Sequence, residues 1–229
     1  MRIEQVFGTT IGDIENHKFN AFLGISIENK YFSKESISQY VRWMDMVSKD
    51  AILILIADEI QAINYQVLGG MEAGAAVRRA EERGLEMARI VQIAVEEMEG
   101  ELTHPIHICR WVDVKGEDYK RALEVITDYW HSNQEFREHI VKNVKKNLGS
   151  RSKTLFAQQL NELSRYLLDE LAVVLGGIVI DQTVFNLNPY PGLGTCQLFA
   201  DLQSGLLFPV LTKALKIKHP VAMVEAYAE

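Results

Sequence analysis

The chain has 229 residues, of which 48% are hydrophobic and 24% are charged, and its formal net charge is −7. This length is ample for a buried core and predicts a single domain over residues 1–229, and the near-average composition excludes disordered, collagen-like and disulfide-rich proteins. The acidic balance argues against a general polyanion binder, although it leaves room for a local basic patch.

Targeting and redox features point to an ordinary intracellular protein. The first twenty residues lack the continuous apolar segment of a signal peptide, and no run reaches the roughly 18 to 20 apolar residues that span a bilayer. Two distant cysteines, Cys109 and Cys196, fit neither a zinc motif nor a disulfide framework. We therefore expect a cytoplasmic protein with reduced thiols, no membrane association, no metal and no cofactor.

The first half of the chain predicts a strand, a helix and a second strand. Residues 19–26 (FNAFLGIS) and 51–57 (AILILIA) are short continuous apolar runs, typical of strands that are covered on both faces. Between them, residues 33–48 place apolar side chains at offsets of three and four, which predicts an amphipathic helix with Ser33 or Ser36 as its cap. Such a unit is a right-handed crossover and indicates an α/β fold with a mainly parallel sheet.

The second half predicts mostly helices. We expect a helix over 70–100, a strand over 106–114, helices over about 116–131 and 133–148, a linker at 149–152, a helix over 152–175 that Gly176-Gly177 ends, and a strand over 178–187. Residues 188–192 (NPYPG) predict a loop, and the tail predicts a short helix and an apolar stretch around 208–215.

Ser26 is the first candidate for chemistry, because it ends the first predicted strand, where parallel α/β sheets bind their ligands. Gly24 leaves room for a substrate near the backbone. The esterase motif G-x-S-x-G is broken, since Glu28 stands at its second glycine, and no histidine (His219, for instance) can be assigned as a base. On position alone, a capping role for Ser26 is the commoner interpretation.

Two phenols and a carboxylate form the second group of candidates. Tyr166 and Glu170 are four residues apart and share one helix face, in a segment that is strongly apolar after Glu170. A carboxylate drawn into such surroundings needs a cation or donors, and a substrate ammonium would serve. Tyr190 lies between two prolines that restrict its backbone. Taken singly, each feature also fits an ordinary structural role.

The combination is more specific. Ser26 and Asn29 in GISIENKYFS, the pair Tyr166-x-x-x-Glu170 and Tyr190 twenty residues later together resemble the cyclodipeptide synthases, from about residue 17 to about residue 210. The resemblance implies a Rossmann-like three-layer domain similar to the catalytic domain of class I aminoacyl-tRNA synthetases. It also implies a cytoplasmic, monomeric aminoacyltransferase that makes cyclic dipeptides (diketopiperazines) from two aminoacyl-tRNAs, without DNA as a partner.

The resemblance also implies roles for individual residues. Ser26 would be the nucleophile, Tyr166 and Glu170 would hold the α-ammonium of the bound aminoacyl group, and Tyr190 would position the hydroxyl or relay a proton. The remaining substrate-binding residues would be Gly24 in the first pocket, Asn29 after the nucleophile, Asn147 in a second pocket, and Pro191. Phe22, Ile52, Ile54, Val173 and Asn188 are candidates for lining the first pocket.

The chain combines markers of two branches of that family. One branch has an asparagine after the nucleophile and a Tyr-His pair in the late loop, whereas the other has Tyr-Pro there and usually lacks that asparagine. This sequence has Asn29 together with Tyr190-Pro191. The Tyr-Pro pair favours the second branch.

A tRNA partner requires positive surface. Residues 137–153 hold six basic side chains and one acidic one, a local net charge of +5. The contacts expected there are Lys142, Lys145, Lys146, Arg151 and Lys153. Arg78 and Arg89 in the 70–100 helix are eleven residues apart and lie almost on the same face. Because Glu82 and Glu86 are interleaved with them, a solvated, ion-paired helix is an equal alternative there.

Two other functions remain open from the sequence. A serine acyl hydrolase or acyltransferase with a small substrate would need a histidine base. A non-catalytic, Rossmann-type tRNA-binding domain would not need the Ser26 hydroxyl at all.

Overall fold

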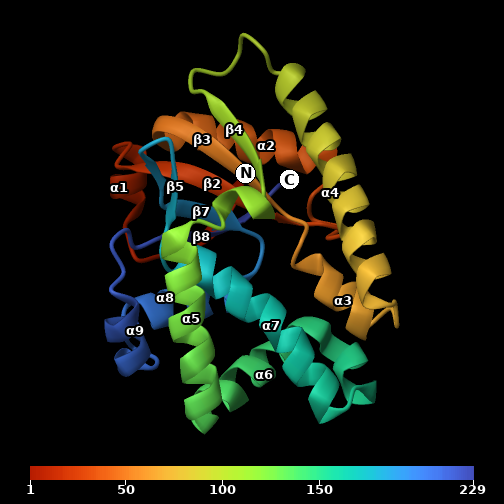
Figure 1. Cartoon of the computed structure of the whole chain (residues 1–229). Coiled ribbons are helices and arrows are strands. Elements are labelled where there is room, and N and C mark those ends of the chain that lie inside the picture. The colour runs from red at the N-terminus through yellow and green to blue at the C-terminus, as the bar shows by residue number, and fades with distance from the viewer.

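A six-stranded sheet forms the centre of the structure, a computed structural model that describes residues 1–229 (Figure 1). Its strands run in the order β1 (Arg2–Phe7), β8 (Ala222–Tyr227), β7 (Leu187–Tyr190), β2 (Phe19–Ser26), β3 (Ser48–Ala57) and β4 (Ile106–Arg110). β1 is antiparallel to β8, and every other neighbouring pair is parallel. The predicted α/β class with a mainly parallel sheet is confirmed.

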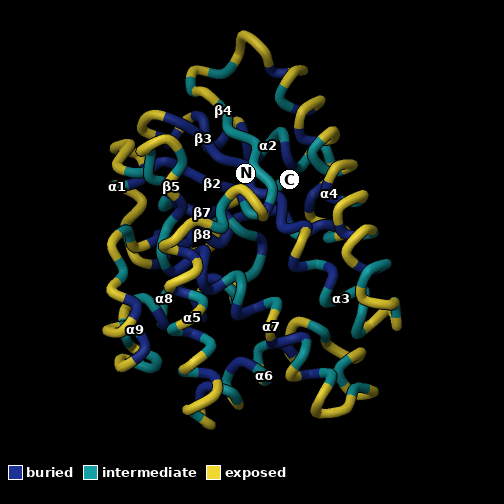
Figure 2. The backbone as a smooth tube through the Cα atoms, viewed as in Figure 1, coloured by how far each residue is buried: buried dark blue, intermediate teal, exposed yellow.

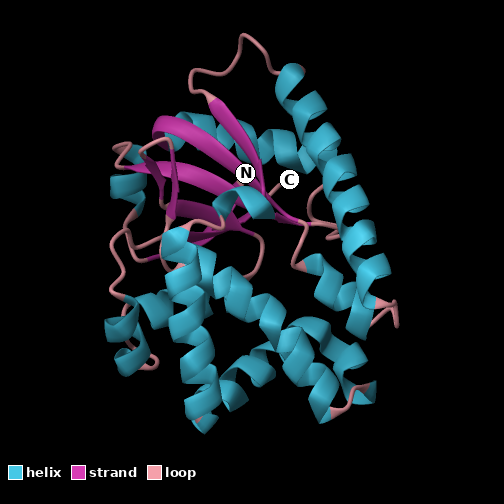
Figure 3. Cartoon of the chain, in the orientation of Figure 1, coloured by secondary structure: helices cyan, strands magenta, loops and turns pink.

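Helices cover both faces of the sheet, which makes three layers (Figure 3). One face carries α1 (Ile11–Glu15), α2 (Lys34–Val47) and α4 (Ala73–Glu96). The other face carries α5 (Glu117–Ser132), α6 (Gln134–Leu148), α7 (Ala157–Val174), α8 (Leu193–Gln203) and α9 (Pro209–Leu215). The short α3 (Gln61–Val67) packs against both α4 and α7.

Strand alternation divides the apolar residues between two cores. On β3, Leu53 and Leu55 face the core beneath α5 to α9, whereas Ile52 and Ile54 face the core beneath α2 and α4. Both sets are buried, so β3 is dark blue along most of its length in Figure 2. This explains the continuous apolar run at 51–57, because a strand covered on both faces needs apolar side chains at every position.

Four predicted helices form close to where they were expected, and α5 and α6 lie within one residue of the predicted ranges 116–131 and 133–148. α2 spans residues 34–47, and the Ser33 hydroxyl accepts a hydrogen bond from the Ser36 N–H at 3.2 Å as its N-cap. α4 lies inside the predicted range 70–100 and is capped by the Glu72 carboxylate, which accepts from the Ala75 N–H at 3.2 Å.

Two predicted boundaries in the second half were wrong. The strand expected over 106–114 ends at Arg110, where a 3₁₀ helix (Trp111–Val114) begins and the Asp113 carboxylate accepts from the Arg110 N–H at 2.8 Å. The helix expected from residue 152 begins at Ala157, because Gly149–Thr154 forms 3₁₀ turns.

The strand expected over 178–187 was also wrong. It is a hairpin of β5 (Ile178–Ile180) and β6 (Thr183–Phe185), in which Asp181 and Gln182 turn the chain with positive φ angles of 46° and 69°. The loop expected over 188–192 is largely strand β7. β1, β8, α1 and α3 were not predicted.

The pairing between β2 and β7 is unusually short. Ala21 with Leu187 is their single ladder pair, whereas β2 pairs with β3 continuously from Ala21 to Ser26. Pro189 has no N–H to give and lies where that ladder has already ended. In the sheet, β3 and β4 lie on one side of β2, whereas β7 and β8 lie on the other, so the strand order reverses between β2 and β7. Open α/β sheets bind ligands in the crevice at the carboxyl ends of the strands that flank such a point.

A buried carboxylate fixes the carboxyl end of β3. Asp58 is 1% exposed, pairs with the Arg110 guanidinium, and accepts from the N–H groups of Glu59 at 2.8 Å and Trp111 at 3.2 Å. Gly84 of α4 lies against it, and a Cβ added there would come within 2.3 Å of an Asp58 carboxylate oxygen. The close approach of α4 to β3 therefore requires glycine at this helical position.

We expect Gly84→Ala to lower the free energy of unfolding by about 1–3 kcal/mol, because the added methyl overpacks against a carboxylate that three partners hold in place. Gly74→Ala, near the start of the same helix, is the matched control, since its Cβ would meet the flexible end of Glu72 at 3.3 Å. Urea denaturation measures both. Equal stability of Gly84→Ala and the parent chain would contradict the packing described.

Candidate active site

Two cavities meet at Ser26. The first, of about 30 Å³, lies between β2, β3, β7 and α7, and the second, of about 170 Å³, lies between α6 and α7. Four residues line both cavities, namely Ser26, Glu170, Tyr190 and Thr195. The junction thus presents two hydroxyls, one carboxyl and one phenol to two separate spaces.

Secondary-structure periodicity brings these side chains together. Ser26 is the last residue of β2, and Gly24 and Phe22 point to the same side at a period of two. Asn188 and Tyr190 do the same on β7. From the opposite side, α7 contributes Tyr166, Glu170 and Val173 at helical spacings of four and three.

The Tyr166 phenol donates a hydrogen bond to Ser26 Oγ at 3.3 Å. Burial, and then the nearby Glu170 carboxyl, raise the pKa of Tyr166 well above its ordinary value. A phenol that keeps its proton this firmly acts as a donor. Tyr166 is therefore placed to orient the Ser26 oxygen and not to deprotonate it.

The Glu170 carboxyl lacks a cationic partner. Burial raises its pKa to about 8, the Asp169 carboxyl adds to that effect, and hydrogen bonding with Tyr166 opposes it. No lysine, arginine or histidine lines either cavity. The Glu170 carboxyl is therefore largely protonated at pH 7, and an incoming ammonium would supply the positive charge that stabilises its carboxylate form.

Tyr190 lines both cavities, and Tyr166 lines the second. Burial and then Glu170 raise its pKa to about 12, while the Ser26 hydroxyl and the Asn29 side chain act in the opposite direction. Asn29 Oδ1 accepts from the Tyr31 N–H at 3.1 Å, which fixes the loop after β2. Asn29 thus lies beside the junction, although it lines neither cavity.

The other predicted binding residues are distributed as follows. Gly24 lines the first cavity, and a Cβ there would meet nothing within 4 Å, so the space beside it is open. Asn147 lines the second cavity. Pro191 is buried immediately after β7 and lines neither.

The prediction for the lining of the first cavity was partly wrong. Phe22, Val173 and Asn188 do line it, whereas Ile52 and Ile54 face the other side of the sheet. Sequence reasoning missed Trp111, Phe199 and Thr195 in the first cavity and Asn64 in the second. None carries a local motif, because the turn after β4 and helices α3 and α8 reach the site only through tertiary packing.

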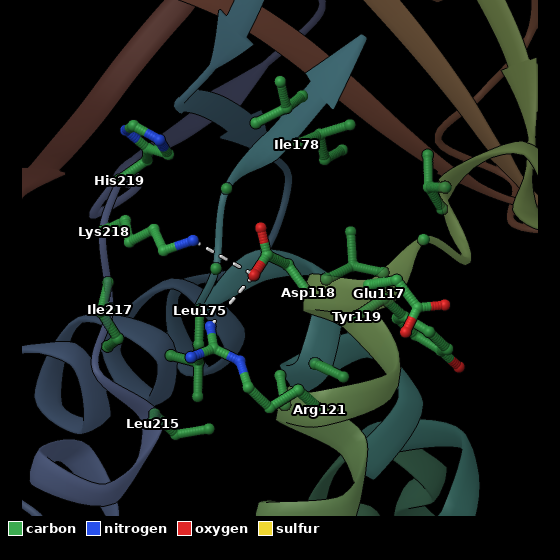
Figure 4. A pocket seen from close by; sticks show the side chains of 18 of the residues that line it. Glu117, Asp118, Tyr119, Arg121, Leu175, Ile178, Leu215, Ile217, Lys218 and His219 are labelled. Carbon is green, nitrogen blue, oxygen red and sulfur yellow. Dashed lines mark hydrogen bonds and ion pairs between the residues drawn. The ribbon is translucent and has the colours of Figure 1, made fainter.

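A larger cavity of about 230 Å³ lies away from Ser26, between the first turn of α5, the end of α7 and residues 215–219 (Figure 4). In it, Asp118 pairs with Arg121 at 3.2 Å and Lys218 at 3.4 Å. His219 lines this cavity and not the two at Ser26. The six histidines therefore leave Ser26 without an imidazole base in either of its cavities.

All seven basic residues proposed to contact tRNA are exposed, and none of them forms an ion pair. They are Arg78, Arg89, Lys142, Lys145, Lys146, Arg151 and Lys153. By contrast, Arg83 on α4 pairs with Glu86 and Glu28. Gly194 directly precedes Thr195 of the junction, and a Cβ added to Gly194 would lie 3.0 Å from the Lys146 ammonium. Lys146 therefore lies close to the junction.

The structure contains no cluster of three or more His, Cys, Asp or Glu side chains suited to a metal ion. None of its helices combines the length and the apolar character needed to cross a bilayer.

Comparison with known proteins relates the chain to one family. A family model described as cyclodipeptide synthase matches residues 6–188. A cyclodipeptide synthase structure from Staphylococcus haemolyticus is similar, with a TM-score of 0.75, 20% identity and coverage of 98% of this chain and 99% of that one. No curated protein sequence matches.

Two further structures share the fold. A Mycobacterium tuberculosis protein, described as showing that cyclodipeptide synthetases are related to type I tRNA synthetases, has a TM-score of 0.73, 17% identity and coverage of 100% of this chain and 96% of that one. A cyclodipeptide synthase from Candidatus Glomeribacter gigasporarum, bound to Phe-tRNAPhe, has a TM-score of 0.63, 16% identity and coverage of 91% and 87%.

The raised pKa of Glu170 makes a prediction about stability. In the folded chain Glu170 keeps its proton up to about pH 8, whereas in the unfolded chain it releases the proton near the ordinary pKa of 4.5. The protonated carboxyl therefore favours the folded state, and the free energy of unfolding falls as the pH rises from about 4.5 to about 8. Glu170→Gln removes the titration. We expect the free energy of unfolding of the variant to match that of the parent chain near pH 4 and to exceed it by roughly 5 kcal/mol at pH 8.5.

Urea denaturation between pH 4 and pH 8.5 measures this difference. Glu162→Gln, on the same helix but outside both cavities, is the matched control. A Glu170→Gln difference that stays constant with pH would show that the carboxyl titrates normally in the folded protein.

Proposed function

Because the chain belongs to the cyclodipeptide synthase family, we propose that it joins the aminoacyl groups of two aminoacyl-tRNAs into a cyclic dipeptide through a seryl-enzyme intermediate. The observation that carries this proposal is the junction itself, where the Ser26 hydroxyl, the Glu170 carboxyl and the Tyr190 phenol all face two cavities. A reaction that condenses two similar acyl groups needs two pockets around one set of reacting groups.

In the first transfer, Ser26 Oγ attacks the carbonyl carbon of an aminoacyl-tRNA. The ester bond to the terminal ribose breaks, the tRNA leaves with its hydroxyl restored, and the aminoacyl group remains as an ester on Ser26. Because the substrate is already an activated ester, this step needs no nucleotide triphosphate. Tyr166 holds the Ser26 oxygen by the 3.3 Å hydrogen bond.

The Glu170 carboxyl binds the α-ammonium of the first aminoacyl group. Entry of the ammonium favours the ionised carboxylate, which burial alone disfavours. A group that titrates near neutrality can also take a proton from the ammonium and return it, so Glu170 is suited to release the free amine that ring closure requires.

In the second transfer, the amine of another aminoacyl-tRNA attacks the carbonyl carbon of the seryl ester. The bond to Ser26 Oγ breaks, the Ser26 hydroxyl is restored, and the dipeptide remains esterified to the second tRNA as the dipeptidyl intermediate. The free amine of this intermediate then attacks the remaining ester, the second tRNA leaves with its hydroxyl restored, and a six-membered ring closes. The larger second cavity, with Asn147 and Asn64 in its wall, takes the second aminoacyl group. Tyr190, which faces both cavities, relays a proton or positions the reacting groups during closure, with Asn29 beside it.

The two other functions receive less support from the structure. A serine hydrolase of the usual type needs a histidine base, and no histidine lines either cavity at Ser26. A domain that only binds tRNA has no need for a buried carboxyl with a raised pKa next to a serine, and such perturbed groups cluster at catalytic sites.

The surface around the second cavity suits the single-stranded end of a tRNA. Exposed cations at the C-terminus of α6 and in the following 3₁₀ turns come shortly before Phe156 in the chain, and Phe156 is 78% exposed at the N-cap of α7. Cations that track phosphates, together with an exposed ring on which a base stacks, are the usual means of binding single strands. Lys146 lies nearest to the junction and would contact the nucleotides next to the ester.

We expect Ser26→Ala to abolish both the covalent intermediate and the product, because the attacking oxygen is removed. Intact-protein mass spectrometry after incubation with a pool of aminoacyl-tRNAs detects the intermediate, and mass spectrometry of the medium of an expressing bacterium detects diketopiperazines. Ser36→Ala, which alters a serine of helix α2, is the matched control. Undiminished product from Ser26→Ala would overturn the seryl mechanism.

We expect Lys146→Ala to raise KM for aminoacyl-tRNA about tenfold with little change in kcat, and to lower the slope of log affinity against log salt by about 1, as for one lost phosphate contact. Lys213→Ala, which removes an exposed cation of α9, serves for comparison and should leave both quantities unchanged. An unchanged salt slope for Lys146→Ala would place the tRNA elsewhere on the surface.

A further inference from the structure

The Asn188 amide is a buried polar group without a partner. Asn188 is 4% exposed and lines the first cavity from β7, and its Oδ1 has no hydrogen-bond partner. Buried polar atoms in folded proteins are nearly always paired, because leaving one unpaired forfeits its interaction with water. An orphaned oxygen in a cavity wall therefore indicates that something else binds there.

The other buried asparagine of the sheet shows that this is not a general property of the fold. Asn20 on β2 donates from Nδ2 to the Val184 carbonyl at 3.0 Å, and its Oδ1 accepts from the N–H groups of Asp50 at 2.7 Å and Ala51 at 3.1 Å. Its amide is fully used to join strands. Asn188 makes no such bond, so it has no comparable structural role.

The surroundings of Asn188 explain why it stays unpaired. Apolar side chains make up most of the remaining wall, including Phe22, Leu55, Val173 and Phe199. Trp111 lines the same cavity and also has an unpartnered Nε1, so this wall holds one unpaired donor as well as one unpaired acceptor. Asn188 Oδ1 is therefore the acceptor in this wall that is left for a ligand.

We infer that Asn188 selects the first aminoacyl group, favouring a compact, uncharged side chain that carries a hydrogen-bond donor, of the serine, threonine or asparagine class. This inference rests on the proposed function, since it assumes that the first cavity receives the side chain of the group bound to Ser26. The donor of the substrate pairs with Asn188 Oδ1, and the apolar wall packs against the rest.

Size and charge narrow the class. The cavity of about 30 Å³ has room for about two waters, given the ~10–15 Å³ that one water needs, and so favours a short side chain. An acidic side chain would find no cation in the wall, and a basic one would compete with the α-ammonium for Glu170. Both charged classes are disfavoured.

Threonine and valine provide the test, because their side chains have nearly the same shape and differ in one hydroxyl. With valine bound, Asn188 Oδ1 stays unpaired, and the cost of such a group corresponds to a preference for threonine of about ten- to a hundredfold. Asn188→Leu replaces the amide by an apolar group of similar size. The preference should then disappear or reverse in favour of valine.

The experiment measures the rate of acylation of Ser26 by intact-protein mass spectrometry, with threonyl-, seryl- and asparaginyl-tRNA against valyl-, alanyl- and leucyl-tRNA. It compares the parent chain with Asn188→Leu and with Asn186→Leu, a matched control at a position that lines neither cavity. We expect the parent chain and Asn186→Leu to prefer aminoacyl groups with polar side chains, and Asn188→Leu to lose this preference.

Three results separate the inference from the function on which it rests. If Ser26 is acylated but the parent chain prefers aliphatic side chains, the inference is overturned and the proposed function stands, whether or not Asn188→Leu folds. If Asn188→Leu keeps the parent ranking, the inference is likewise overturned. If a pool of all aminoacyl-tRNAs leaves Ser26 unmodified, the proposed function fails, and the inference fails with it.

Discussion

The removal of the Glu170 carboxyl from water is the constraint on which the site depends. A carboxylate in an apolar environment without a cation is unfavourable, and the protein tolerates it because α7 buries half of its residues in the core and cannot turn Glu170 outward. The consequence is an acid that titrates near neutrality and gains a partner only when a substrate amine arrives. Binding and proton transfer are thus properties of the same group.

The remaining parts of the site are held by rigid elements rather than by loops. Ser26, Asn188 and Tyr190 are fixed by the alternation of two neighbouring strands, and Tyr166 and Glu170 by consecutive turns of one helix. Groups placed in this way keep their mutual geometry better than groups on flexible connections. The bonds of Asp58 extend this rigidity to β4 and to the turn that carries Trp111.

The sequence was most informative where periodicity and burial coincide. The continuous run at 51–57 revealed a buried strand, and the spacing between Tyr166 and Glu170 placed both on one face. It was least informative where an outcome depends on tertiary packing. A strand that is apolar at every position does not show which alternate residues face the ligand, so Ile52 and Ile54 were assigned to the wrong side.

Other features were hidden for related reasons. Pro189 favoured a loop, yet the residue is tolerated in β7 because the ladder to β2 stops before it. Thr195 and Asn64 belong to helices whose approach to Ser26 is set by contacts distant in sequence. The roles of Asn29 and Asn147 were suggested by family resemblance, and their placement beside the junction agrees with that suggestion without testing it.

The short ladder between β2 and β7 has a wider consequence. Continuous pairing of these strands would close the sheet where the first aminoacyl group is proposed to bind. Because the pairing stops at Ala21 and Leu187, the two strands separate toward their carboxyl ends and leave space there. The bound aminoacyl group then packs between β2 and β7 as a core side chain would. It pairs with the polar groups that the chain leaves unpaired, and it departs as part of the product. Its fit depends on where backbone pairing stops as well as on the size of the surrounding side chains.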